Sequence, residues 1–257
     1  MKKKQLYFLL ALMVILLGLL NAGAWAFFTG WMSKNQEVAI GKDVAAEYEK
    51  KYGAVEDPKI TAIGMKMVPY CGRSDIEYHF RILQTDEPNA MSIMGGFIYI
   101  NRGLLKMLQG DESQVAFVLG HELAHAANRH MVKNVEKSIS GGLILQLALG
   151  GSSPTAQQLA SIAWELTQLG YSREEEYQAD HFGAAYMKEA GYPVKGAVLA
   201  LQQLQKLGGG NGPEFLMSHP ELAKRISRIE TDYPDSVSTT SSTTTTTVKE
   251  KSSGSKN

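Results

Sequence analysis

Residues 115–125 read VAFVLGHELAH and set two histidines four positions apart inside a largely apolar run. Asp111 can serve as the N-cap, and we predict one long helix over residues 112–137. Because positions i and i+4 share a helical face, His121 and His125 can reach the same metal ion. Two imidazoles and a carboxylate buried among apolar side chains need a partner, and a metal ion would supply one.

The glutamate inside this pattern indicates catalysis. Glu122 follows His121 and can reach past the metal to a bound water molecule. Zinc lowers the pKa of such a water to about 7, so a nearby carboxylate can take its proton as the water attacks a carbonyl. The alternative is a chance pattern on a solvated helix, with the glutamate in a salt bridge. The apolar flanks count against that alternative.

A second stretch offers a third ligand. A catalytic zinc ion takes three protein ligands, and residues 171–180 read YSREEEYQAD. Glu176 and Asp180 are four apart on one helical face, so Glu176 can bind the metal while Asp180 accepts a hydrogen bond from a ligand histidine. We expect Glu174 and Glu175 to be solvated.

The remaining body is predicted to be mostly helical. Apolar residues at every second position predict a strand over residues 76–82, and a second strand over 97–100 follows a glycine pair. The sequence therefore predicts an α+β, mostly α-helical domain with a small sheet placed early. Cap and stop signals predict helices over residues 35–52, 58–67, 154–169, 174–190 and 194–207, and a last one ending near residue 233.

Four segments resemble one known family. In chain order they are residues 89–105 (NAMSIMGGFIYINRGLL), the HELAH motif, residues 172–180 (SREEEYQAD) and residues 218–225 (SHPELAKR). The family is the zinc metallopeptidase (gluzincin) family of the CAAX prenyl proteases, which includes Oma-type mitochondrial and BepA-type bacterial periplasmic proteases. Residues 91–94 depart from a stretch that often carries Ala and Pro in the family.

The resemblance covers roughly residues 34–233. This body lacks the multiple transmembrane helices of the prenyl protease branch and the tetratricopeptide repeats of BepA-type proteases. It therefore resembles the compact, single-domain, extracytoplasmic branch. The resemblance implies a zincin-like metalloprotease fold in which an edge strand of the early sheet flanks the active-site helix.

The resemblance also implies roles for individual residues. Three of them become ligands of one Zn²⁺ per chain, and a fourth becomes the general base: His121, His125 and Glu176, and then Glu122. Asp180 is expected to orient His121, and Arg225 to pin the nearby loop or neutralise an acid. His219 matches a residue close to the metal, where it either stabilises the oxyanion or caps the zinc and holds the enzyme inactive.

The strand after the glycine pair is predicted to bind substrate. An extended peptide can add itself to an exposed strand edge, and glycines let its backbone approach closely. Such pairing recognises the backbone of the substrate and not its side chains, which predicts broad specificity and a preference for unfolded segments. The alternative is a plain core strand with a glycine bulge. The expected contact residues are Asn89, Gly95, Gly96, Phe97, Ile98 and Tyr99.

The two ends of the chain differ from the body. Lysines at residues 2–4 precede residues 5–33, which carry no charge. This pattern predicts either a signal peptide cleaved after residues 24–26 (AWA) or a retained membrane anchor with an aromatic belt. Both place the body outside the cytoplasmic membrane, anchored or exported to the periplasm or cell exterior. We expect three parts: 1–33 as signal or anchor, 34–234 as metallopeptidase domain, and 235–257 as a disordered, Ser/Thr-rich tail.

The composition argues against nucleic-acid binding proteins and excludes proteins held together by internal disulfides. The 257 residues carry 26 basic and 26 acidic side chains, and this zero net charge argues against nucleic-acid binding. The single cysteine, Cys71, cannot form an internal disulfide and is expected to be buried. We expect His79 to be solvated, His181 to point away from the site, and His130 to lie on a different helical face from the metal ligands.

Two functions from different classes remain. The leading one is a zinc-dependent endopeptidase that acts on unfolded or misassembled polypeptides outside the cytoplasmic membrane, in envelope protein quality control. The other is a zinc-stabilised holdase or assembly factor whose protease site is silent or blocked by His219. Glu122 favours catalysis, because a structural zinc site closes its fourth position and needs no acid beside the metal.

Overall fold

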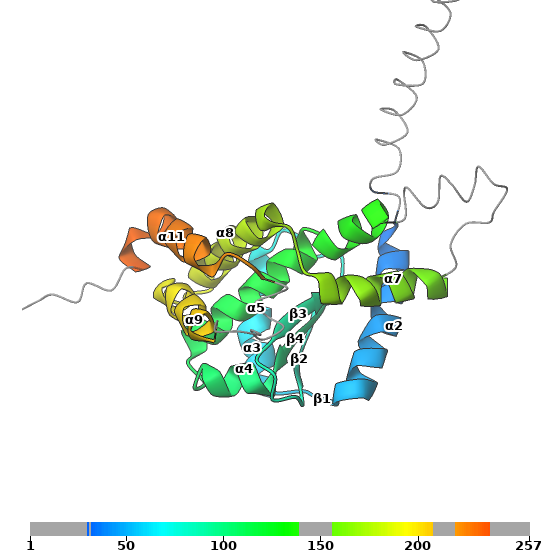
Figure 1. Cartoon of the computed structure of the whole chain (residues 1–257), viewed down its shortest axis with the longest axis horizontal. Coiled ribbons are helices and arrows are strands. Elements are labelled where there is room, and N and C mark those ends of the chain that lie inside the picture. The colour runs from blue at the N-terminus through cyan, green and yellow to red at the C-terminus, as the bar shows by residue number, and fades with distance from the viewer. Residues whose placement is uncertain (1–29, 31, 139–155, 208–218, 237–257) are drawn as a thin grey trace, which may run out of the picture.

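The computed structural model describes residues 30, 32–138, 156–207 and 219–236 (Figure 1). Within these ranges no helix combines the length and the apolar composition needed to cross a bilayer. The predicted signal or anchor lies almost entirely outside them, as does the predicted tail.

Helices dominate and the strands come early, which confirms the predicted α+β class. The elements are α2 (Lys34–Tyr52), β1 (Ala54–Val55), α3 (Pro58–Met67), η1 (Val68–Tyr70), β2 (His79–Leu83), β3 (Ala90–Ile93), β4 (Phe97–Asn101), α4 (Arg102–Met107), α5 (Glu112–Ala127), α7 (Ala156–Leu169), α8 (Arg173–Glu189), α9 (Lys195–Lys206), α11 (Leu222–Asp232) and η2 (Pro234–Ser236).

These strands form one mixed sheet in the order β1-β2-β4-β3. β2 and β4 run parallel, with Phe80 opposite Ile98, and β3 and β4 form an antiparallel hairpin with Ser92 opposite Ile98. β1 adds a short antiparallel pairing to β2. β4 is therefore an interior strand, and β3 is the edge strand that packs against α5.

The sheet separates two apolar cores, because successive side chains of a strand point to opposite faces. On one face Phe80, Ile98 and Ile100 pack with α3, α5, α8 and α9. On the other face Ile93 and Tyr99 pack with α2 and α7. Figure 1 shows α2 and α7 on one side of the sheet and α3 and α5 on the other. The domain thus has three layers, with α5 directly on the sheet.

α5 begins at the predicted cap and is crossed closely by α8. The Asp111 carboxylate accepts hydrogen bonds from two first-turn backbone N–H groups, at 2.9 and 3.0 Å. Where α5 and α8 cross, a Cβ on Gly183 would lie only 2.7 Å from the backbone nitrogen of His121. Glycine at this position therefore lets α8 approach the helix that carries the HELAH motif.

The strand predictions need two corrections. The strand predicted over residues 76–82 begins only at His79, because its ladder starts opposite Phe97, the first residue of β4. The strand predicted over residues 97–100 as an exposed edge is wrong in that respect. It is the interior strand β4, and its two edges are taken by β2 and β3. The edge strand that flanks α5 is β3.

The helix predicted over residues 112–137 is interrupted. α5 ends at Ala127, and Arg129 takes a left-handed φ of 57° before a second helical segment, residues 130–138. The Arg129 guanidinium donates to Glu37 Oε2 at 2.9 Å and to the Met32 carbonyl at 2.7 Å. Contacts distant in the sequence therefore accompany this break.

Candidate metal centre

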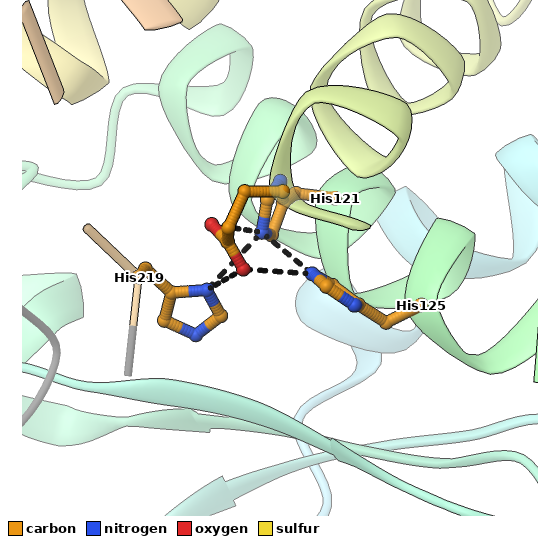
Figure 2. A group of neighbouring side chains, drawn as sticks. His121, His125 and His219 are labelled. Carbon is orange, nitrogen blue, oxygen red and sulfur yellow. Dashed lines mark hydrogen bonds and ion pairs between the residues drawn. The ribbon is translucent and has the colours of Figure 1, made fainter. Parts of the chain in front are cut away.

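Three parts of the fold bring four potential metal ligands together. His121 and His125 project from one face of α5, Glu176 from α8, and His219 from the segment before α11. Their ligand atoms lie within 4.8 Å of one another, and each residue is at most 2% exposed. Figure 2 shows the three imidazoles turned toward one another.

The spacing of these atoms suits a small tetrahedral ion. His121 Nε2 lies 3.1 Å from His125 Nε2 and 3.3 Å from His219 Nδ1. Glu176 Oε1 lies 3.3 Å from His125 Nε2 and 2.9 Å from His219 Nδ1. Tetrahedral zinc with bonds of about 2.1 Å separates its ligand atoms by roughly 3.4 Å. The donor set and its distances therefore fit a zinc ion.

Glu122 adjoins this ligand set and is fully buried. In the part of the chain that the structure describes, neither carboxylate oxygen has a hydrogen-bond partner. The Nε2 atom of His219 lies 3.6 Å from Oε1 of Glu122. Burying a carboxylate without hydrogen bonds is costly. Its place beside the ligands is the one that a general base would occupy.

Arg225 of α11 ties the ligand set to α8. Its Nε and Nη2 each lie 2.7 Å from an oxygen of Asp180, and its Nη1 lies 2.7 Å from Glu176 Oε2. Asp180 Oδ1 in turn lies 3.0 Å from His121 Nδ1. A carboxylate at this nitrogen fixes the tautomer that leaves Nε2 available to a metal. The structure thus brings Asp180 and Arg225 to the site.

For Glu176, Asp180 and His219, the neighbouring charges together shift the pKa further than burial shifts it in the opposite direction. Burial alone would raise the pKa of both carboxyl groups, but His219 and Arg225 hold the pKa of Glu176 well below its usual value, and Arg225 lowers that of Asp180. Burial would lower the pKa of His219, yet Glu176 raises it. Burial keeps the pKa of His125 well below its usual value. Ionised carboxylates and a neutral His125 are the forms that bind a metal.

Three residues around His125 were not expected at the site. His130 Nδ1 lies 2.9 Å from His125 Nδ1, and His130 Nε2 lies 2.7 Å from Gln178 Oε1. The Tyr171 ring stacks on His125, with centroids 3.8 Å apart. A continuous helix would turn His130 away, and the break at Arg129 brings it back. The only local signal of that break is a polar Asn-Arg pair after the apolar run.

The residues predicted to bind substrate fall into two groups. Asn89 lines a cavity of about 20 Å³ beside the candidate ligands, together with Tyr171 and His219, which were not among the predicted substrate-binding residues. The others lie in the β3–β4 turn or in β4, where they hold the sheet together: Gly95, Gly96, Phe97, Ile98 and Tyr99.

The other singled-out residues lie away from the ligands. The His181 side chain is 57% exposed and Cys71 is buried, as expected. His79 is only partly exposed and stacks on Phe97, which corrects the expectation of a solvated side chain.

A family model described as peptidase family M48 matches residues 54–232. The chain belongs to peptidase family M48. The match spans the sheet, α5, α8 and α11 and so includes every candidate ligand. It confirms the resemblance seen in the motifs, and M48 metallopeptidases depend on a metal.

Three curated relatives are similar in sequence to this M48 chain. The β-barrel assembly-enhancing protease of Escherichia coli is 24% identical over 213 residues, which cover 76% of this chain and 43% of the relative. The mitochondrial metalloendopeptidase OMA1 of Schizosaccharomyces pombe is 26% identical over 200 residues, 76% of this chain and 59% of the relative. The metalloprotease YcaL of Escherichia coli is 28% identical over 198 residues, 75% and 74%. The chain thus spans about half the length of the first two relatives. All three names are those of proteases, which confirms the predicted enzyme class.

Proposed function

We propose that this M48 chain is a zinc-dependent endopeptidase that hydrolyses peptide bonds of unfolded or misassembled proteins outside the cytoplasmic membrane. One observation carries the proposal: Glu122 is fully buried without a hydrogen bond from the described residues, beside four side chains that fit a zinc ion. A structural zinc site has no use for such a carboxylate. The relative named for β-barrel assembly supports a role in envelope protein quality control.

Each residue has one task in the proposed reaction. The two α5 histidines and Glu176 hold the ion. When bound, zinc supplies a Lewis acid that polarises the scissile carbonyl and lowers the pKa of water to about 7. Glu122 takes a proton from the attacking water and delivers it to the leaving amine. Asp180 and Arg225 keep the ligands oriented, through their contacts with His121 and Glu176.

His219 would offer a bound ion a fourth ligand. Its Nδ1 faces His121 and Glu176, and its Nε2 faces Glu122. The imidazole therefore fills the space in which a substrate carbonyl and a water would meet. We infer that this conformation is closed and that His219 must withdraw before hydrolysis. Of the two roles expected for His219, capping the metal suits this conformation better than stabilising an oxyanion.

The same four-ligand arrangement favours a second candidate, the zinc-stabilised holdase or assembly factor. Structural zinc sites are closed by four protein ligands, whereas catalytic sites keep one position open. The two candidates differ in the effect of removing His219. An endopeptidase would gain activity, whereas a binding module would gain none.

The β3 edge offers a backbone to which an extended substrate can pair. Asn101 N–H donates to the Asn89 carbonyl at 2.8 Å, one step beyond the β3–β4 ladder. Because antiparallel bonds alternate, Ala90 and Ser92 turn their backbone groups to the outer edge. The Tyr171 hydroxyl lies 3.5 Å from the Ser92 carbonyl there. We propose that substrates pair with β3, in place of the β4 residues first expected, and with little side-chain selectivity.

The test compares the full chain, purified in mild detergent, with Glu122→Gln and His219→Ala. Bound zinc is measured by elemental analysis and cleavage is followed on casein. We expect Glu122→Gln to bind one zinc ion and to lose about 10²- to 10⁴-fold in rate, because the general base is gone. We expect His219→Ala to keep its zinc and to cleave faster than the wild type.

Other outcomes separate the candidates. If the wild type and His219→Ala both bind zinc, leave casein intact and keep a heat-labile globular protein soluble on heating, the holdase is correct and the endopeptidase is not. If no form binds zinc, both candidates fail.

A further inference from the structure

His125 has a contact that the proposed reaction does not use. Its Nδ1 lies 2.9 Å from Nδ1 of His130, whose Nε2 lies 2.7 Å from Oε1 of Gln178 on α8. His130 is fully buried. A chain of polar contacts therefore runs from a candidate ligand on α5, through a second imidazole, to an amide on α8.

The chemistry of these groups sets the direction of the hydrogen bonds. An amide oxygen only accepts, so His130 carries its proton on Nε2. A neutral imidazole protonated there keeps a lone pair on Nδ1, which accepts from Nδ1–H of His125. His125 then keeps its own lone pair on Nε2, the atom 3.3 Å from Glu176 Oε1. A metal-binding imidazole needs this tautomer.

We propose that His130 and Gln178 are positioning residues that fix the tautomer and the ring orientation of His125 for the metal. The inference rests on the metal site of the proposed function. α8 then holds the two α5 histidines by different means: Asp180 contacts His121 with a carboxylate, and Gln178 reaches His125 through a neutral imidazole.

A neutral partner suits the charge of the site. A divalent ion and Arg225 would cancel the charges of the three carboxylates buried at this site, which are Glu122, Glu176 and Asp180. A fourth carboxylate at His125 would leave an uncompensated buried charge, which is costly. The His130–Gln178 pair supplies orientation without adding one.

The backbone is shaped for this contact. On a continuous helix, His130 would lie about 140° around the axis from His125. The left-handed φ of 57° at Arg129 instead turns the chain, so that His130 faces back toward His125. The Arg129 side chain is held by Glu37 Oε2 at 2.9 Å.

The test measures the zinc affinity of the full chain in detergent by competition with a chromophoric chelator, so the readout does not depend on catalysis. His130→Leu removes the acceptor, whereas His130→Asn offers an amide oxygen near the former Nδ1. Gln178→Leu removes only the group that fixes the His130 tautomer. Gln203→Leu is the matched control, because Gln203 donates to Gln114 at 2.8 Å between α9 and α5, away from the ligands.

We expect His130→Leu to weaken zinc binding about 10- to 100-fold and Gln178→Leu about 10-fold. His130→Asn should recover most of the loss, and Gln203→Leu should match the wild type. Nitrogen-15 NMR of histidine-labelled, zinc-free wild type should show the His125 proton on Nδ1. In Gln178→Leu, the His130 signals should shift toward a mixture of tautomers.

Unchanged zinc affinity in folded His130→Leu and Gln178→Leu would overturn the inference, and so would a His125 proton on Nε2. Circular dichroism reports whether each variant folds. If His130→Leu does not fold, the comparison of Gln178→Leu with Gln203→Leu decides alone. A wild type that binds no zinc would refute the proposed function itself, which separates the two failures.

Discussion

At the scale of single residues, the candidate metal centre is a set of buried charged side chains. Each of them would be costly to bury without the others. Arg225 is 1% exposed and gives three nitrogens to Asp180 and Glu176, each at 2.7 Å. An unpaired ion at this depth would cost several kcal/mol, whereas close pairing offsets much of that cost. Arg225 therefore acts on folding first, through the two carboxylates, and on the metal only second.

Arg225→Leu is expected to lower the free energy of unfolding of the zinc-free full chain by about 3–5 kcal/mol, because two buried carboxylates lose their cation. The control is Arg228→Leu on the same helix, which removes an exposed cation 4.2 Å from the Tyr177 ring and should cost about 1 kcal/mol or less. Urea unfolding followed by circular dichroism measures both. Equal losses in the two variants would contradict the role given to Arg225.

Sequence alone goes far toward the ligand set but not to its surroundings. Helical periodicity predicts that His121 and His125 share a face. Glu176 is implied as the third ligand by the acidic stretch downstream and by the family resemblance, and the ligand set stays a prediction. His130 could not be placed, because its position depends on the left-handed backbone of Arg129. Arg129 in turn contacts Glu37, 92 positions away. No local pattern contains that partner.

At the scale of one element, α5 depends on the cap that begins it. Asp111→Ala removes the acceptor for two first-turn N–H groups and is expected to cost about 1 kcal/mol of unfolding free energy. Asp111→Asn keeps an acceptor oxygen and should cost less. Urea unfolding at neutral pH compares them. An alanine variant as stable as the wild type would show that packing alone sets the start of α5.

The same cap gives a dependence on pH. Hydrogen bonds from Ser113 and Gln114 hold the pKa of Asp111 below its usual value. A carboxylate with a lower pKa in the folded state stabilises the fold above its unfolded pKa, near 4, and this contribution is lost as pH falls through the folded pKa. The stability difference between wild type and Asp111→Asn should therefore be largest near neutral pH and shrink below about pH 4.

The sheet shows why the position of a strand in the strand order is harder to predict than the presence of the strand. The sequence predicts substrate pairing at an exposed edge of β4, where the preceding glycine pair would let the substrate backbone approach closely. Residues 97–100 of β4 read FIYI, apolar without alternation, which is typical of a strand covered on both faces. Strand order depends on pairing between distant segments, here β2 beside β4. The glycines instead serve close packing, since a Cβ on Gly96 would lie 2.1 Å from the Glu77 carbonyl.

At the scale of the whole molecule, the ligands join three parts of the chain that are distant in sequence. α5 lies on the sheet, and α8 crosses α5. The segment before α11 closes the site with His219. An unfolded chain would not hold these side chains together, so a metal that binds them binds the folded state. Binding of a metal by these side chains would therefore be coupled to folding.

Removing the metal is therefore expected to lower the melting temperature of the full chain. At a free zinc concentration of 100 times Kd, binding contributes about 2.7 kcal/mol. For a domain of this size that corresponds to a fall of roughly 5–10 °C. Scanning fluorimetry with and without chelator measures it. Glu122→Gln should respond like the wild type, because Glu122 is not a ligand, whereas Glu176→Gln should respond little. A Glu176→Gln variant that zinc stabilises fully would remove Glu176 from the ligand set and leave His219 as the third protein ligand.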